Sequence, residues 1–318
     1  MSARWKYAVL CFLALLTALI APSCSRTAEP PRRLSNQIYN RMVYVRTATG
    51  SEVFVNMPGH WDLGSASISP DSKWVAFDGL TIGDNPERET WLLGVDGNGL
   101  RKLSDGGTPR WSPDGKRLLI CRDVVGNFSQ QHQMYEFEIA TGKEKLIREG
   151  RFADWSPDGK RIVFAAEGSR TENTGVHPGS QIWTADADGS GAAKLCDGNW
   201  PSWSPDGKTI AYCVQEQGKP GEIWIFDLDT KQQKKIGLGH YRAQWAGDSK
   251  SFVCNGSYPI PGETTYSRAP ARFRLDKPLR PTYFSTELDN PWSPCVSRDD
   301  RITVLIVDSQ KRRGDDEQ

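Results

Sequence analysis

Short apolar runs separated by polar turns recur along the chain. The runs RLLIC, RIVFA and TIAYC, at residues 117–121, 161–165 and 209–213, each follow the same six-residue turn, WSPDGK. Each is followed by a loop and then by a segment in which apolar and polar residues alternate, such as residues 181–188 and 222–229. Alternation with a period of two is typical of strands with one buried face, and the chain between the turns lacks the 3.6-residue period of a helix. The pattern predicts an all-β chain.

The WSPDGK turn marks an internal repeat. It occurs three times without change, and degraded copies extend the series. The copies are aligned on the serine of WSPDGK or on the residue at its position in a degraded copy. These positions are Ser69, Ser112, Ser156, Ser204, Ala246 and Ser297, with spacings of 43, 44, 48, 42 and 51 residues. Proline presets φ, and the serine and aspartate oxygens bond nearby amides, so this turn suits a tight hairpin. A period of this length is typical of propeller blades with four strands each.

The number of strands predicts how the two ends of the repeat region meet. Six such turns each join two strands, but only five pairs of outer strands follow them. The missing pair is found in residues 42–56, which contain two strands and a turn. We therefore predict an all-β, six-bladed β-propeller of four-stranded antiparallel blades over residues 41–309. Its N-terminal strands complete the last blade, which removes free sheet edges.

The repeats resemble those of a known family. The WSPDGK turns, and segments of the form IWxxDxDG such as residues 182–189, look like the repeats of TolB-like propellers. Similar blades form the non-catalytic propeller of prolyl oligopeptidase-type peptidases. The resemblance extends over about Met42 to Asp308 and implies a non-enzymatic protein that binds a protein or peptide in the cell envelope. TolB carries an α/β domain before its propeller, whereas a short segment precedes the repeats here.

The N-terminal residues have a different composition from the rest. Residues 8–21 form a largely apolar run after two basic residues, which is typical of a secretory signal and short for a transmembrane helix. The small residues before Cys24 resemble a bacterial lipoprotein signal, in which that cysteine is lipidated; ordinary cleavage near Ser23 is the alternative. We expect a signal peptide (1–24), a flexible tether (25–40) and a charged tail (310–318). The protein is then exported, to the periplasm or outer membrane, and contacts a membrane only through its lipid.

Composition and motifs exclude several kinds of function. Lys and Arg number 40 and Asp and Glu 39, for a formal net charge of +1, so no nucleic-acid partner is expected. The GxSxG motif of a serine hydrolase does not occur, and the serine of a turn repeated in every blade serves the turn. We expect no catalytic residue and no cofactor. Five cysteines follow the signal without zinc-site spacing, and their disulfide pairing stays open: Cys121, Cys196, Cys213, Cys254 and Cys295.

The four histidines are all expected on one face of the propeller. His132 and His177 fall in loops between the second and third strands of blades, and His60 and His240 fall in loops that lead into innermost strands. Sugar-cleaving lyases of similar architecture hold a metal with His and Gln in the channel, and His60, His240 and Gln244 are candidate ligands here. No carboxylate accompanies them at a ligand spacing, so we expect no metal site.

A Gly-x-aromatic pattern precedes several innermost strands, for example Gly150-Arg151-Phe152 and Gly198-Asn199-Trp200. Because these strands surround the channel, we expect a binding ring at its mouth, since aromatic and arginine residues dominate interfaces. The ring consists of His60, Trp61, Arg151, Phe152, Asn199, Trp200, His240, Tyr241 and Trp292. Aromatic residues that fill the wedge between blades are the structural alternative. The expected partner is an envelope protein or peptide; the alternative is a carbohydrate, bound or cleaved as in oligouronide lyases.

Overall fold

The structure is a computed structural model that describes residues 41–57, 59–83, 86–124, 131–167, 180–216, 219–259, 266–284 and 291–308. All of these belong to one compact unit, Tyr39–Gln318. Within the described ranges, no helix has the length and apolarity to cross a membrane. The predicted signal with Cys24, the tether and the charged tail all lie outside the described residues.

Four-stranded antiparallel sheets that resemble propeller blades repeat along the chain. The first, from inside to outside, consists of β3 (His60–Ile68), β4 (Trp74–Thr81), β5 (Arg88–Gly94) and β6 (Arg101–Asp105). The second consists of β7 (Gly107–Trp111), β8 (Arg117–Val124), β9 (Gln131–Glu138) and β10 (Glu144–Glu149). The third consists of β11 (Arg151–Trp155), β12 (Arg161–Glu167), β13 (Ser180–Asp186) and β14 (Ala193–Asp197).

The fourth and fifth units share a strand. The fourth consists of β15 (Asn199–Trp203), β16 (Thr209–Val214), β17 (Glu222–Asp227) and β18 (Gln233–Trp245). The 13-residue β18 is also the innermost strand of the fifth, which continues with β19 (Ser251–Pro259), β20 (Tyr266–Arg274) and β21 (Thr282–Tyr283). The sequence predicted two separate strands here. In the first three units a glycine with positive φ (Gly106, Gly150 or Gly198) separates the outermost strand from the next innermost strand, whereas Gly239 has no positive φ, and β18 continues through it.

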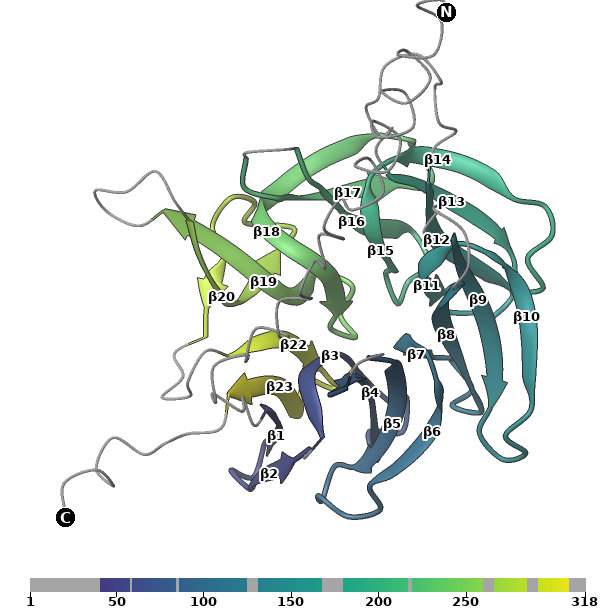
Figure 1. The fold of residues 1–318 in the computed structure, drawn as a ribbon. Helices are drawn as coiled ribbons and strands as arrows, with labels where there is room; N and C mark the ends of the chain where they lie inside the picture. The colour runs from purple at the N-terminus through teal and green to yellow at the C-terminus, as the bar shows by residue number, and fades with distance from the viewer. Residues whose placement is uncertain are drawn as a thin grey trace, which may run out of the picture. The chain divides into compact units, whose positions relative to one another are not determined.

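The last sheet joins both ends of the described chain. It consists of β22 (Trp292–Val296), β23 (Ile302–Asp308), β1 (Arg41–Thr47) and β2 (Glu52–Asn56). Strand β1 pairs with β23 in an unbroken register from Arg41↔Asp308 to Thr47↔Ile302. The pair Val45↔Val304 at its centre is fully buried. The predicted completion of the last sheet by the N-terminal strands is confirmed, and Figure 1 shows the sheets arranged around a centre with β7, β11 and β15 inside.

The repeated turn forms the hydrogen bonds expected from its sequence. Ser204 Oγ donates to the carboxylate of Asp206 and accepts from the backbone N–H of Thr209, at 2.6 and 2.9 Å. The copies at Ser112 and Ser156 repeat both contacts. The turn therefore closes the hairpin between the first two strands of these units. The opposite end of the innermost strand takes no part in the turn.

The core lies between neighbouring sheets. One cluster, for example, joins Leu119 and Met134 of the second unit to Trp155 and Phe164 of the third. The cysteines after the signal are free thiols in the structure, and all but Cys121 are buried, as expected of small apolar residues. Burial raises the pKa of Cys213 to about 12, which makes this thiol unreactive at neutral pH.

Candidate functional site

Each innermost strand contains a β-bulge. In five of the six units, two residues of the innermost strand oppose one residue of the next strand, as between Arg151 and Asp154 on β11. One residue other than glycine adopts a positive φ within every bulge, which is a strained conformation for such residues. These residues are Ser65 (φ 50°), Thr108 (56°), Phe152 (55°), Trp200 (54°), Tyr241 (67°) and Ser293 (50°). We call them the bulge ring.

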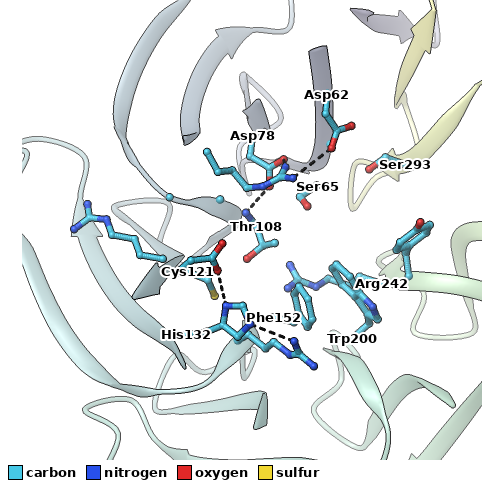
Figure 2. A pocket seen from close by; sticks show the side chains of 18 of the residues that line it. Asp62, Ser65, Asp78, Thr108, Cys121, His132, Phe152, Trp200, Arg242 and Ser293 are labelled. Atoms are coloured by element: carbon cyan, nitrogen blue, oxygen red, sulfur yellow. Dashed lines mark hydrogen bonds and ion pairs between the residues drawn. The ribbon is translucent and has the colours of Figure 1, made fainter. Parts of the chain in front are cut away.

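All six residues of the bulge ring line one cavity of about 620 Å³. Figure 2 labels Ser65, Thr108, Phe152, Trp200 and Ser293 around this cavity. A bulge reorients a side chain that a regular strand would direct into its neighbours. In each of the six units, a bulge thus places one side chain at the cavity.

Three aromatic residues of the bulge ring contact one another. The rings of Phe152 and Trp200 stack with their centroids 3.5 Å apart and their planes at 21°. Tyr241 meets Trp200 edge to face at 5.5 Å and 83°. With 39% of its surface exposed, Tyr241 is one of the exposed large apolar residues of the described chain. One wall of the cavity is therefore a continuous aromatic surface formed by the third, fourth and fifth units.

Arg151, beside this surface, is held in place by polar contacts. Its Nη2 donates to Ser180 Oγ at 2.7 Å, and its Nη1 donates to His132 Nε2 at 3.2 Å. His132 must then carry its proton on Nδ1, which faces the carboxylate of Asp123 at 2.6 Å. The hydrogen bond from His132 lowers the pKa of Asp123. The chain of contacts fixes one side of the cavity as a polar surface.

A second polar network lines the opposite side, on the first unit. Asp78 is fully buried and accepts from Arg88 Nη1 at 2.7 Å and from the backbone N–H of Thr108 at 2.6 Å. Arg88 also donates to Asp62, at 3.3 Å, and Asp62 accepts from Arg41. The charge of Asp78 is the main cause of a raised pKa of Arg88. The charges of two arginines and two aspartates thus balance in this network. The hydrogen bond from the backbone of Thr108 connects the network to the bulge ring.

Two further arginines, Arg110 and Arg242, lie buried at the centre, with 5% and 8% of their surface exposed. Arg110 donates to Gln244 Oε1 and, at 3.3 Å, to the carbonyl of Ala243, and its Nε lies 3.7 Å from Asp154 Oδ1. Arg242 lines the cavity, but its Nε and Nη2 have no hydrogen-bond partner among the described residues. Burial and then the charge of Arg110 lower the pKa of Arg242 to about 9, so it remains a cation at neutral pH.

The predicted binding ring is only partly at the cavity. Arg151, Phe152, Trp200, Tyr241 and Trp292 line it. Asn199, also of the predicted ring, accepts the backbone N–H of Trp200 at 3.0 Å and so supports its neighbour. The side chain of Trp61, like the whole of His177, lies outside the described residues.

The histidines of the predicted ring are buried away from the cavity wall. His60 is 7% exposed, and its Nε2 lies 3.0 Å from Glu89 Oε2. His240 is 5% exposed and accepts the backbone N–H of Gly221, at 3.2 Å. Burial, followed by the charge of Arg268, lowers the pKa of His240 to about 4. Gln244, the third of the candidate metal ligands, bonds Arg110 and the carbonyl of Ala66. The described chain contains no cluster of three His, Cys, Asp or Glu that could hold a metal.

Sequence reasoning missed Ser65, Thr108, Ser293 and Arg242. The Gly-x-aromatic pattern placed the first unit at His60-Trp61, where β3 does have a register shift, but the residue with positive φ is Ser65, in a second shift of the same strand. In the last unit, Ser293 rather than Trp292 has the positive φ. A signal was available, because proline follows Thr108, Trp200 and Ser293 directly. Arg242 carried no such signal, since no proline follows Tyr241 or Arg242 in the sequence.

Comparison with known proteins places the chain by fold. No family model matches it, and no curated protein does. Among solved structures, it is similar to TolB from Acinetobacter baumannii, at 16% identity and a TM-score of 0.53 over 85% of this chain and 64% of that one. It is also similar to Kuenenia stuttgartiensis hydrazine synthase, at 14% identity and 0.53 over 79% of this chain and 77% of that one. It is similar as well to Pyrococcus horikoshii acylaminoacyl peptidase, at 13% identity and a TM-score of 0.51 over 79% of this chain and 46% of that one.

The shared feature is the propeller fold. Proteins with such different names share it, so the fold alone assigns no activity. The chain spans 64% of the length of that TolB chain.

Proposed function

We propose that this chain is a six-bladed, TolB-like propeller that binds a protein or peptide of the cell envelope, without catalysis, at the cavity bordered by the bulge ring. The observation that carries the proposal is the aromatic wall of Phe152, Trp200 and Tyr241, held at positive φ on rigid strands. The positive φ recurs in every unit and directs these side chains into the cavity, and only these three units place aromatic residues there. Clustered aromatic residues on a rigid scaffold are the usual anchors of protein interfaces.

The N-terminal sequence supports a location in the cell envelope. A largely apolar run at residues 8–21, followed by Cys24, supports export and a lipid anchor, which would place the propeller in the periplasm or at the outer membrane. A partner in the same compartment would meet the cavity without crossing a membrane. The sequence-based alternative, a carbohydrate ligand at the same mouth, stays a prediction.

Site-directed photo-crosslinking in the native host tests the proposal. The crosslinking amino acid p-benzoylphenylalanine replaces Tyr241, which is 39% exposed beside the cavity. The matched control carries it at Phe54, which is 46% exposed on β2, the outermost strand of its sheet. We expect a discrete protein adduct from the first position and none from the second, identified by mass spectrometry. No adduct at Tyr241, or the same adducts from both positions, would contradict the proposal.

A further inference from the structure

The bulge of the fifth unit is longer than the other five. Between the paired residues His240 and Gln244, three residues of β18 oppose the single residue Cys254 of β19. In the third unit, by comparison, two residues, Phe152 and Ala153, oppose one. The extra residue is a departure from the repeat, and it lies in the segment that carries Arg242. A residue that only one blade contains is not required by the architecture that all blades share.

Arg242 is a buried cation without an anion of its own. It is 8% exposed, lines the cavity, and has no hydrogen-bond partner for Nε and Nη2 among the described residues. The nearby carboxylate of Asp154 is already engaged, since it accepts from Ser202 and from the backbone N–H of Trp203, at 3.0 Å each, and faces Arg110. An uncompensated charge is costly to bury, so such a group calls for a partner that the chain does not itself supply.

Two further hydrogen-bonding groups that line the cavity are also unpartnered. Asn255, 3% exposed, has no partner for Oδ1, and Thr108, 9% exposed, has none for Oγ1, within the described ranges. Both oxygens can accept from an N–H group. The cavity therefore presents one strong donor to an anion, two acceptors and the aromatic wall. A peptide carries a carboxylate, amide N–H groups and apolar side chains together, whereas a uronic acid such as galacturonate has no amide N–H.

We propose that the cavity binds a carboxylate of a peptide, with the guanidinium of Arg242 as its direct ligand. The proposal rests on the function proposed above and names the chemical group that the partner inserts. Arginine and carboxylate form paired, charge-assisted hydrogen bonds, which are stronger in a buried site than at a surface. Binding would also neutralise the charge that the free protein holds at a cost. The carboxylate is either the chain terminus or an Asp or Glu side chain of the partner, and the two sources are separable by experiment.

Calorimetric titration of the purified full chain with short peptides tests this. Three pools of acetylated tripeptides are used: uncharged residues with a free carboxyl terminus, an internal Glu with an amidated terminus, and uncharged residues with an amidated terminus. Galacturonate serves as a sugar acid. We expect one of the two acidic pools to bind and the uncharged amidated pool not to bind. Equal binding of all pools, no binding of either acidic pool, or binding of galacturonate alone would overturn the proposal.

The variant Arg242→Gln removes the charge and leaves a side chain that can still form hydrogen bonds. We expect it to weaken binding of the acidic pool by about tenfold or more, since a hydrogen bond to a charged group contributes about 1.5–3 kcal/mol. The control is Arg148→Gln, because Arg148 is a partly buried arginine that donates to Gly189 and does not line the cavity. It should bind like the wild type. Unchanged affinity in Arg242→Gln would refute the role of Arg242.

The same variant separates this inference from the function on which it rests. The photo-crosslinking residue at position 241 is combined with Arg242→Gln in the native host. An adduct seen in the otherwise wild-type chain and lost in the variant supports both proposals. An undiminished adduct in the variant refutes the carboxylate site and leaves the binding function in place. No adduct in either chain refutes the binding function.

Discussion

The variant Arg242→Met should be more stable than the wild type in the absence of ligand. Methionine keeps much of the length and the apolar stem of arginine, but it carries no charge into the centre of the sheets. Most substitutions of buried residues destabilise a protein, so a gain is a demanding prediction. It follows from Arg242 being buried, charged and without a hydrogen-bond partner for Nε and Nη2 in the described chain.

The magnitude follows from the pKa of Arg242, which burial lowers to about 9 from an ordinary value above 12. One pKa unit corresponds to about 1.4 kcal/mol, so holding the charge in this site costs on the order of 4–5 kcal/mol. Methionine recovers part of this, because some packing and solvation by the cavity are lost with the guanidinium. We expect the free energy of unfolding to rise by about 1–4 kcal/mol, the range seen when buried ionic groups become apolar.

Urea unfolding at pH 7, followed by tryptophan fluorescence, measures the change. The control is Arg110→Met, because Arg110 is equally buried but bonded to Gln244 and Ala243 and close to Asp154. Its loss leaves Asp154 without its cation and should destabilise the protein by about 3–5 kcal/mol. The two variants are thus predicted to have opposite signs. If Arg242→Met lowers the free energy of unfolding as Arg110→Met does, then the charge of Arg242 is compensated and the reasoning is wrong. Above about pH 9 the gain should shrink, because the folded wild type then loses the proton.

Three further predictions concern the turns, the bulges and the buried histidine. Ser204→Ala removes the acceptor of the Thr209 backbone N–H and should lower the free energy of unfolding by about 1 kcal/mol in urea titrations. Ser65→Val should cost about 1–3 kcal/mol, because a branched residue tolerates a φ of 50° poorly, whereas Ser65→Gly should not be destabilising; equal losses would contradict the strain at this bulge. Because the pKa of His240 is lowered to about 4, its contribution to stability is present above its ordinary pKa of about 6.5 and is lost as pH falls towards 4. His240→Gln should therefore flatten this part of the stability profile, and an unchanged profile would contradict the assignment.

The fold could be predicted from the sequence because its signals are local and repeated. The serine, proline and aspartate of each turn act within six residues, and the hydrogen bonds of Ser112, Ser156 and Ser204 follow from that short range. The pairing of β1 with β23 spans the whole repeat region, yet it followed from counting strands, because a closed ring leaves only one place for the unmatched pair.

The candidate site could be predicted only in part, because its geometry depends on bulges. A bulge shifts the register by one residue, and the sequence does not state where the extra residue lies. The Gly-x-aromatic pattern therefore identified Phe152, Trp200 and Tyr241 correctly, but it could not identify small residues such as Ser65 and Ser293. The burial of Arg242 without a partner for Nε and Nη2 depends on what strands of other units place around it, which no local pattern reports.

The cavity has two chemically different sides, because the side chains of the bulge ring differ between the units. Positive φ occurs in every unit and belongs to the architecture, but the side chains at these positions differ around the ring. The third to fifth units contribute Phe152, Trp200 and Tyr241, whereas the sixth, first and second contribute only the small side chains of Ser293, Ser65 and Thr108. Beside the small residues, the cavity is bordered by the network of Asp62, Asp78 and Arg88 and by Trp292. Beside the aromatic residues, it is bordered by their rings and by Arg151. A ligand that fills the cavity should therefore place its apolar part against the third to fifth units and its polar part opposite. Arg242, next to Tyr241 in sequence, also lines the cavity, so a ligand with an anionic group joined to an apolar one would contact both residues.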